Sequence, residues 1–221
     1  MEMNKLRIMG SDYVGLFTVC NDTLAFVPKG LDKKEKDLIE KTLDVKVVET
    51  KIYESSLLAV FSKMNNKEII LPSYANSTEI ENIEKEIKVK IIDTDHALGN
   101  LIELNDTSII LSQTLNFEEV KEFSKLKLNL LQTNIAKNDT VGSSLLLTNK
   151  SFLINPNASD EEIKLIQDLT KFKGGASTSN TGDILVRNSI LANKNGIIVG
   201  DRTTGHEMNR IEEALEYNSL K

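Results

Sequence analysis

The stretch VGLFTVCNDTLAFVP, residues 14–28, decides the fold, because four further stretches of the chain match it. The matches run without a gap over fifteen residues: LAVFSKMNNKEIILP from Leu58, LGNLIELNDTSIILS from Leu98, GSSLLLTNKSFLINP from Gly142 and VRNSILANKNGIIVG from Val186. The starts are 44, 40, 44 and 44 residues apart. The chain of 221 residues therefore consists of five repeats.

Each window has asparagine at its eighth position: Asn21, Asn65, Asn105, Asn149 and Asn193. Asparagine between two apolar runs is typical of a hairpin turn, because it tolerates left-handed backbone and bonds to its own backbone. We therefore predict a β-hairpin in each window. The second arms, such as Ile109 to Leu111, are continuously apolar, which predicts strands covered on both faces.

A helix-start signature follows each hairpin, in which a short polar residue is followed three positions later by glutamate. The pairs are Asp32/Glu35, Asn76/Glu79, Asn116/Glu119, Ser159/Glu162 and Thr204/Glu207. Apolar residues then recur at helical spacing, as in Met208, Ile211 and Leu215. We predict five helices that pack on the hairpins.

A β-rich segment follows each of the first four helices, and three of these segments end at Thr50, Thr94 and Thr133. The fourth segment is KFKGGAST, and the chain ends after the fifth helix. At the other end, LRIMG (residues 6–10) is a strand without a partner, so it can complete the fifth unit and hide the sheet edges of an open array.

These patterns predict an α/β fold of five ββαβ repeats closed into a ring. We expect one domain over residues 1–221, with repeats at approximately 3–44, 45–88, 89–128, 129–172 and 173–221.

The composition excludes some classes of protein. With 40% apolar and 27% charged residues the chain is globular, and its net charge of −6 excludes long-range attraction to nucleic acid or anionic lipid as the main binding force. We expect a neutral or basic partner. One cysteine, a charged N-terminal segment and no apolar run of membrane-spanning length predict a cytoplasmic protein with no membrane contact.

Catalytic and metal-binding signals are weak, so we predict no catalytic residue, metal or cofactor. In the alignment Cys20 corresponds to Met64, Leu104, Thr148 and Ala192, which favours a packed strand position over a reactive thiol. The two histidines, His96 and His206, have no second histidine or cysteine at metal-ligand spacing.

Two other segments and the lysines of the helices each have both a structural and a functional interpretation. DTDHALGN (93–100) could do acid–base chemistry, but Asp93 belongs to a recurring strand end. GDRTTG (200–205) could hold an anion, but it lacks the lysine of a phosphate loop, which favours a helix cap at Thr204. Lysines of the predicted helices, such as Lys33, Lys34 and Lys121, alternate with glutamate and are typical of a solvated surface.

The five turns would meet on one face of a ring. There they would form a polar rosette suited to hydrogen bonding with a partner, although turn geometry alone also explains the asparagines. Together with the LGN segment, this gives our candidate partner-binding residues: Asn21, Asn65, Gly99, Asn100, Asn105, Asp106, Asn149 and Asn193.

Several segments resemble the translation initiation factor 6 family, the ribosome anti-association factors, in its archaeal form. They are HALGNLIELND from His96, TVGSSLLLTNK from Thr140, ILANKNGIIVGDRTTGHEMNRIEEAL from Ile190 and LFTVCNDTLAFVP from Leu16. The resemblance covers almost the whole chain. The chain departs from the pattern at two positions. Arg187 stands where other windows have glycine, and Ser112 replaces a proline.

The resemblance implies a pentein-type five-fold α/β propeller without enzymatic activity. It implies a monomer that binds the joining face of the large ribosomal subunit, mainly through a ribosomal protein near the sarcin-ricin loop, with minor rRNA contact. Bound there, it would block association with the small subunit until release factors of the translational GTPase type remove it. An acidic protein would suit a basic ribosomal protein.

Two alternatives stay open. The pentein fold also occurs in guanidine-modifying enzymes with a cysteine nucleophile, although Cys20 lies in the first repeat and far in sequence from His96. A scaffold that binds another basic protein is the second alternative.

Overall fold

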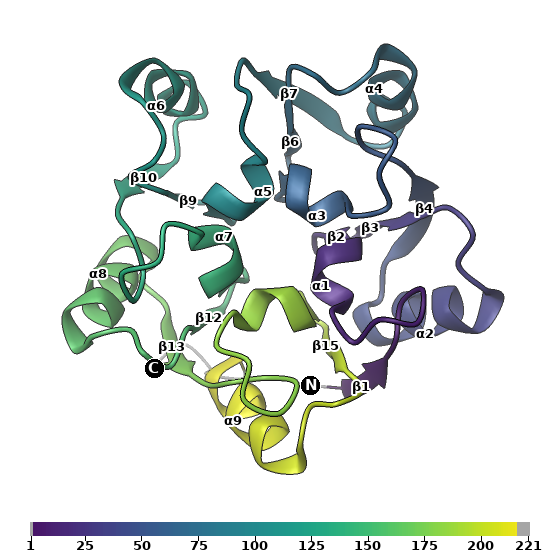
Figure 1. Ribbon diagram of the computed structural model, residues 1–221, viewed down its shortest axis with the longest axis vertical. Helices are drawn as coiled ribbons and strands as arrows, with labels where there is room; N and C mark the ends of the chain where they lie inside the picture. The colour runs from purple at the N-terminus through teal and green to yellow at the C-terminus, as the bar shows by residue number, and fades with distance from the viewer. Residues whose placement is uncertain (1, 216–221) are drawn as a thin grey trace.

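The computed structural model describes residues 2–215, and within them five three-stranded sheets surround a central axis (Figure 1). This is the predicted α/β propeller of five ββαβ repeats. The antiparallel hairpins are β2 (Val19–Cys20) with β3 (Leu24–Pro28), β5 (Lys63–Met64) with β6 (Glu68–Pro72), β8 (Ile102–Leu104) with β9 (Ser108–Leu111), β11 (Leu145–Leu147) with β12 (Ser151–Ile154), and β14 (Ile190–Ala192) with β15 (Gly196–Gly200).

A parallel third strand joins each hairpin: β4 (Lys46–Thr50), β7 (Lys88–Ile92), β10 (Asn129–Gln132), β13 (Lys173–Ala176) and β1 (Glu2–Leu6). With the repeats numbered as predicted, each sheet combines the hairpin of one repeat with the third strand of the next. The middle strands are buried along their whole length, as their apolar runs predicted.

Strand β1 pairs with β15 from Glu2 opposite Gly196 to Leu6 opposite Gly200, so the first and last of the described strands share one sheet and close the ring. The predicted position of this strand, LRIMG, was four residues too late. Ile8 is instead buried in the core and bridges to Ser11 in a tight loop.

The outer helices pack between the sheets, and each begins at its predicted cap: α2 (Lys33–Leu43), α4 (Ser77–Glu84), α6 (Phe117–Ser124), α8 (Asp160–Thr170) and α9 (Gly205–Leu215). Reciprocal capping bonds form at the first four, and Thr204 and Glu207 make the same pair of bonds at α9. The helices and sheets enclose five apolar clusters, which contain the fully buried Phe26, Phe123 and Phe152. Within residues 2–215 none of the helices has the length and apolar character needed to cross a bilayer.

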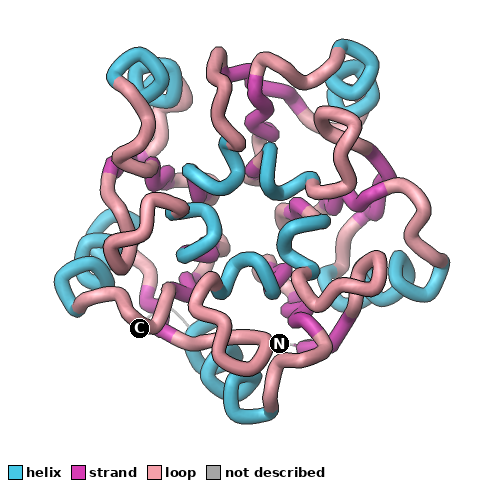
Figure 2. Tube along the Cα trace, in the orientation of Figure 1, coloured by secondary structure: helices cyan, strands magenta, loops and turns pink. Residues whose placement is uncertain are grey.

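Five one-turn helices surround the axis, and the sequence did not predict them (Figure 2). They are α1 (Val14–Phe17), α3 (Leu58–Phe61), α5 (Leu98–Leu101), α7 (Val141–Ser144) and the 3-10 helix η1 (Val186–Ser189). These residues were predicted as the start of each hairpin. A Cβ at Gly99 would lie 1.9 Å from the carbonyl oxygen of Ala59, so small residues let neighbouring inner helices approach closely.

The fourth window was misaligned by one residue. The Thr148 hydroxyl accepts the turn amides of Lys150 and Ser151, as the Asn21 side chain does in its own turn, so Thr148 and not Asn149 is the equivalent of the turn asparagines. The inner helices start 44, 40, 43 and 45 residues apart. Leu147, not Thr148, is then the equivalent of Cys20.

The third strands also differ in detail from the prediction. Strand β4 ends at Thr50 as expected, but β7 ends at Ile92 and β10 at Gln132, so Thr94 and Thr133 lie beyond the paired residues. Threonine is therefore the last paired residue in β4, and it lies two residues beyond the paired segment in β7 and one residue beyond it in β10.

Candidate functional site

The five hairpin turns meet at one end of the axis, and their side chains bond chiefly to one another. The side-chain amide of Asn21 donates to the carbonyl of Asn65 at 2.9 Å, Asn65 donates to Asn105 at 3.1 Å, and Asn105 donates to Thr148 at 2.9 Å. Asn193 donates to Asn21 at 2.9 Å. An asparagine side chain thus makes four of the five contacts between neighbouring turns, and we call this arrangement the turn circle.

These asparagines have little exposed surface: 7% for Asn21, 4% for Asn65, and 3% for Asn105 and Asn193. Their side-chain oxygens also accept amides of their own turns, for example from Lys67 and Glu68 to Asn65. Side chains that are buried and hydrogen-bonded in this way stabilise the ring, and they have little surface to offer to a partner.

A second layer lies outside the turn circle and contains Asp22, Asn66, Asp106, Asn149 and Lys194. The side-chain amides of Asn66 and Asn149 each donate to both carboxylates, Asp22 and Asp106, at 2.7–3.0 Å. Asp22 is buried, Asn66 is exposed, and Asp106 and Asn149 are half-buried. The two aspartates are thereby bridged by amides.

Hydrogen bonds decide the charge state of Asp22. Partial burial raises the pKa of this carboxyl, but bonds from Asn66 and Asn149, together with the backbone amide and ammonium of Lys194, outweigh burial and lower the pKa. Asp22 therefore remains ionised and holds the second layer together.

The cavity under the turn circle is small. Its volume is about 30 Å³, and its lining includes Cys20, Met64, Leu104, Leu147 and Ala192. That volume holds roughly two water molecules, whereas ligand sites are on the order of 300 Å³ or more. Burial raises the pKa of the Cys20 thiol to about 11, so the thiol stays protonated and is a poor nucleophile.

Three buried charged side chains lie in the interior of the ring: Arg187, which the sequence marks as a departure from the repeat glycine, and Lys63 and Glu103, which were not among the predicted site residues. The Lys63 ammonium lies 2.5 Å from the Glu103 carboxylate and 2.9 Å from the carbonyl of Gly142. Arg187 donates to the carbonyls of Gly15 and Ile190, and its Nε lies 4.0 Å from Glu103. We call Lys63, Glu103 and Arg187 the axial triad.

Burial lowers the pKa of Lys63 to about 8, although the charge of Glu103 opposes this effect. A signal for the triad was present in the sequence. Lys63 and Glu103 both lie two residues before a turn asparagine, where the other hairpins have Val19, Leu146 and Leu191. A charged residue at a position that is apolar in the other repeats indicates that the charge is buried and paired with an opposite charge.

Gly99 and Asn100 lie at the other end of the inner strands, in α5. Gly99 is buried against Ala59, and Asn100 is half-buried. The predicted site residues therefore do not form one site: strand β8 separates Gly99 and Asn100 from Asn105 and Asp106.

The end of the ring that carries the inner helices also carries the starts of the outer helices, and we call it the capped face (Figure 1). Four exposed apolar residues lie in its loops: Met9, Tyr13, Tyr53 and Ile184. Each outer helix has at least one acidic residue in its first turn. In α6 and α8 these residues include the exposed Glu118, Asp160 and Glu161, whereas Glu79 in α4 and Glu207 in α9 are buried. The capped face thus combines exposed apolar groups with negative charge at α6 and α8.

The remaining sequence candidates have structural contacts. Asp93 accepts a hydrogen bond from Ser73, and Thr204 caps α9 as predicted. Within residues 2–215 His96, His206 and Cys20 belong to no group of metal-ligating side chains. Backbone amides of Thr204 and Gly182 lower the pKa of Glu207 to about 2, against the effect of partial burial, which shows how strongly the loop holds this cap.

The fold and these contacts define a closed α/β ring whose surfaces, rather than its axis, are accessible to partners. The sequence of the ring then gives its family. The model of the eIF-6 family matches residues 3–214, and the chain belongs to this family. The chain is 35% identical to translation initiation factor 6 of Pyrococcus horikoshii, over 98% of this chain and 100% of that protein. It is 34% identical to the Sulfolobus acidocaldarius protein of the same name, over 97% and 99%.

Solved structures give more distant likenesses. A DDAH mutant from Pseudomonas aeruginosa complexed with citrulline matches with a TM-score of 0.44 and 12% identity, over 94% of this chain and 74% of that chain. An agmatine deiminase from C. jejuni matches with a TM-score of 0.37 and 14% identity, over 67% and 58%.

Proposed function

We propose that this protein binds the joining face of the large ribosomal subunit and prevents premature association with the small subunit. Membership of the eIF-6 family supports a role in translation. The partner is mainly a ribosomal protein near the sarcin-ricin loop, with minor rRNA contact, and release requires a factor of the translational GTPase type. The net charge of −6 favours a basic protein surface over RNA.

The capped face docks on the subunit. The observation that carries this proposal is the contrast between the two ends of the ring. The side chains of the turn circle are buried and bonded within the ring, whereas the capped face exposes Tyr13 and Tyr53 and, in other repeats, the acidic first turns of α6 and α8. Exposed aromatic side chains are typical of the centre of protein interfaces.

This changes the role of the predicted site residues. Asn100, half-buried in α5, is a contact residue on the capped face. Gly99 positions α5, and the turn residues Asn21, Asn65, Asn105 and Asn193 support the ring. Asp106 and Asn149 belong to the second layer at the opposite end and do not contact the subunit.

We also propose that the protein acts as a cytoplasmic monomer without enzymatic activity. The interior of the ring supports the absence of enzymatic activity. The axial cavity of about 30 Å³ is too small for a guanidine substrate, and Arg187 itself places a guanidinium group inside the ring. Cys20, the candidate nucleophile of the guanidine-modifying alternative, has a raised pKa. The other alternative is a scaffold for another basic protein. Such a scaffold would also need an acidic, accessible surface, so the co-sedimentation experiment below distinguishes it from the proposed function.

Co-sedimentation with isolated archaeal large subunits tests the proposal, and a subunit-joining assay in sucrose gradients measures its consequence. We expect co-sedimentation that weakens as salt is raised, and fewer joined ribosomes. Asn100→Arg on the capped face should weaken binding about tenfold. Thr23→Arg adds the same charge at the exposed turn end and should not. Free sedimentation at both low and moderate salt would contradict the proposal and favour the scaffold.

A further inference from the structure

Three aromatic side chains of the second repeat meet on the capped face. Tyr53 belongs to the loop before α3, Phe61 ends α3, and Tyr74 precedes the cap of α4. The ring centroids of Tyr53 and Tyr74 are 4.9 Å apart, and that of Phe61 lies 5.9 Å from Tyr53 and 6.2 Å from Tyr74. All three pairs are T-shaped, with interplanar angles of 61°, 69° and 88°. We call Tyr53, Phe61 and Tyr74 the aromatic cluster.

The aromatic cluster connects the core with the surface. Phe61 packs against the apolar core of the first two repeats. Phe61 and Tyr74 are half-buried, whereas Tyr53 is 57% exposed. A partner would therefore meet the ring of Tyr53 first.

The fold does not require aromatic residues at these three positions. Each position has equivalents in other repeats, defined by the bridged loop, the end of the inner helix, or the second residue before the helix cap. The equivalents of Tyr53 are Met9, Ala136 and Asn180, those of Phe61 are Phe17, Leu101, Ser144 and Ser189, and those of Tyr74 are Gly30, Thr114, Asn157 and Arg202. The combination of three rings is thus particular to the second repeat, and the architecture of the ring does not explain it.

Hydrogen bonds hold the aromatic cluster in place. The φ angle of Tyr53 is 55°, in the left-handed region that a bulky residue adopts only where its surroundings impose it. Glu79 accepts the amides of Tyr53 and Glu54 at 2.7 and 2.8 Å, and the Tyr74 hydroxyl donates to the carbonyl of His96 at 2.8 Å. The rings are therefore positioned before a partner arrives, which lowers the entropic cost of binding.

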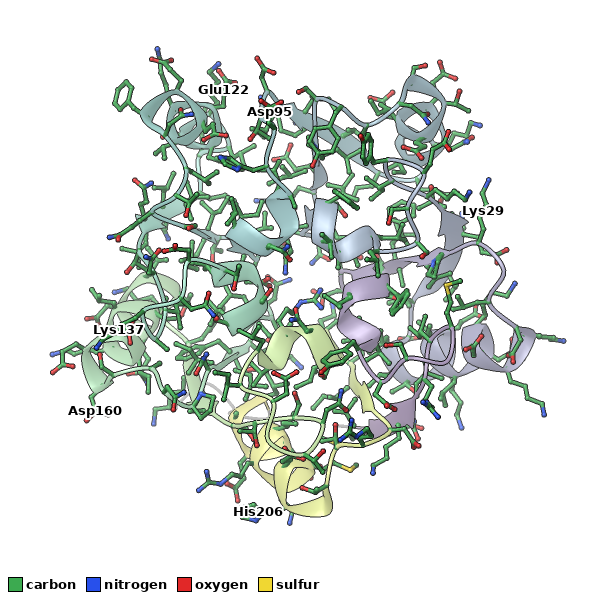
Figure 3. The ribbon with its side chains drawn as sticks, viewed as in Figure 1. Lys29, Asp95, Glu122, Lys137, Asp160 and His206 are labelled. Atoms are coloured by element: carbon green, nitrogen blue, oxygen red, sulfur yellow. The ribbon has the colours of Figure 1, made fainter. Side chains whose placement is uncertain are left out.

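Two carboxylates adjoin the aromatic cluster. Glu54 follows Tyr53 in the chain, and Asp95 precedes His96, whose carbonyl accepts the Tyr74 hydroxyl. Both are exposed, and in the described part of the chain (residues 2–215) neither carboxylate has a hydrogen-bond or ion-pair partner. Burial raises the pKa of Tyr74, and Tyr53 and the charge of Asp95 add to this rise, which agrees with a short separation between Asp95 and the phenol. Figure 3 shows Asp95 at the periphery of the capped face.

An aromatic surface beside unpaired carboxylates suits a cationic side chain. Cations are attracted to the faces of tyrosine and phenylalanine rings, and arginine makes this contact more often than lysine. A planar guanidinium group can stack on a ring while its N–H groups donate to a carboxylate. An apolar side chain would contact the rings equally well but would leave both carboxylates without a partner. The two features together therefore favour arginine.

We propose that the aromatic cluster binds an arginine side chain of a basic protein partner. The guanidinium group stacks on the exposed ring of Tyr53, and the carboxylates of Glu54 and Asp95 attract its charge. The inference deepens the proposed function and rests on it only in taking the partner to be a ribosomal protein.

Titration with two synthetic peptides tests this contact directly. One peptide alternates arginine with glycine over nine residues, and the other replaces every arginine with citrulline, which has nearly the same shape but no charge. NMR shifts of the Tyr53 ring protons and of the amides of Ser55 and His96 locate the binding and give the affinities. We expect the arginine peptide to bind about fivefold more tightly than the citrulline peptide.

Matched variants separate the ring contact from general surface charge. Tyr53→Leu keeps an apolar group but removes the ring, and it should reduce the preference for arginine over citrulline to about twofold or less. Tyr53→Phe keeps a ring and should preserve the preference. Tyr13→Leu changes another tyrosine of the capped face, which is 42% exposed, and should also preserve the preference.

Equal affinity for both peptides, or a preference that persists unchanged in Tyr53→Leu, would overturn the inference. Co-sedimentation with large subunits separates its failure from that of the proposed function. If the unaltered protein binds the subunit but does not prefer the arginine peptide, the proposed function stands and the arginine contact does not. If it prefers the arginine peptide at Tyr53 but does not bind the subunit, the contact stands and the proposed function does not.

Discussion

Asn105 shows what a single residue contributes to this ring. Its side-chain oxygen accepts the amides of Thr107 and Ser108, which fixes its own turn, and its side-chain amide donates to Thr148 in the next repeat. One asparagine thus satisfies local and long-range partners at once. A buried group with several bonded partners is costly to remove, because each partner is left without a bond.

This predicts that the turn asparagines matter for stability. Asn65→Ala should lower the free energy of unfolding by about 2 kcal/mol or more, since three bonded backbone groups lose their partner. Chemical denaturation measures the change. Asn66→Ala, at the exposed neighbouring position, should cost less. An Asn65→Ala variant of unchanged stability that no longer binds the large subunit would contradict the structural role.

The axial triad predicts a pH dependence. Because the folded pKa of Lys63 is about 8 and the ordinary value is 10.5, the unfolded chain binds more protons between these pH values. The contribution of Lys63 to stability therefore rises as pH increases from about 8 to 10.5, with a slope of at most about 1.4 kcal/mol per pH unit.

Lys63→Met should remove this rise, measured as the unfolding free energy at several pH values. Cys20 acts in the opposite direction above pH 9, because its pKa is raised, so both proteins should carry Cys20→Ala. Lys67→Met, at an exposed lysine of the same hairpin, should leave the rise in place. A rise that persists in Lys63→Met would show that another group causes it.

At the scale of elements, the inner helices depend on small residues. A Cβ at Gly142 would lie 2.0 Å from the carbonyl oxygen of Gly99 and 2.5 Å from that of Ile102. Arg187 occupies the equivalent position in the fifth repeat, and its guanidinium bonds to the carbonyls of Gly15 and Ile190. The circle of inner helices thus needs small residues at most positions and accepts one long side chain that reaches into the interior.

Gly142→Ala should therefore be strongly destabilising, by about 3 kcal/mol, because backbone atoms of α5 cannot move without opening the ring. Thermal unfolding monitored by circular dichroism measures this. Gly205→Ala is the matched control, since a Cβ there meets no atom within 4 Å. It should have no destabilising effect. Similar losses in both variants would show that loss of glycine, and not contact between inner helices, is responsible.

At the scale of the whole molecule, strand β1 closes the ring. It pairs with β15 over five residues, and Met3 packs against the core cluster of the fifth repeat. Without it the buried strand β15 would expose one edge, and an unpaired edge promotes pairing with other chains. Closure thus protects the ring from association.

Deleting residues 1–6 should lower the midpoint of thermal unfolding and produce oligomers in size-exclusion chromatography. Asn4→Ala, which leaves the strand in place, is the control for loss of side-chain contacts alone. It should remain in the same elution volume as the unaltered protein. A deletion variant that stays monomeric and equally stable would show that the other four sheets hold the ring without closure.

The sequence by itself determined the number of repeats, the outer helices with their caps, and the closed α/β ring. These features follow from local chemistry repeated in phase: Asn116 and Glu119 form a capping pair wherever a helix begins, and the apolar run Ile109 to Leu111 requires cover on both faces.

Only the tertiary structure decided which of these residues are accessible. The turns of Asn21 and Asn105 look alike whether they face solvent or a neighbouring turn, and the burial of Lys63 depends on Glu103, forty positions away. The misaligned Asn149 has the same origin, because threonine at 148 can accept the same turn amides and only the backbone register reveals it. Contacts between repeats depend on distances in space, and these distances cannot be read from the spacing of residues along the chain.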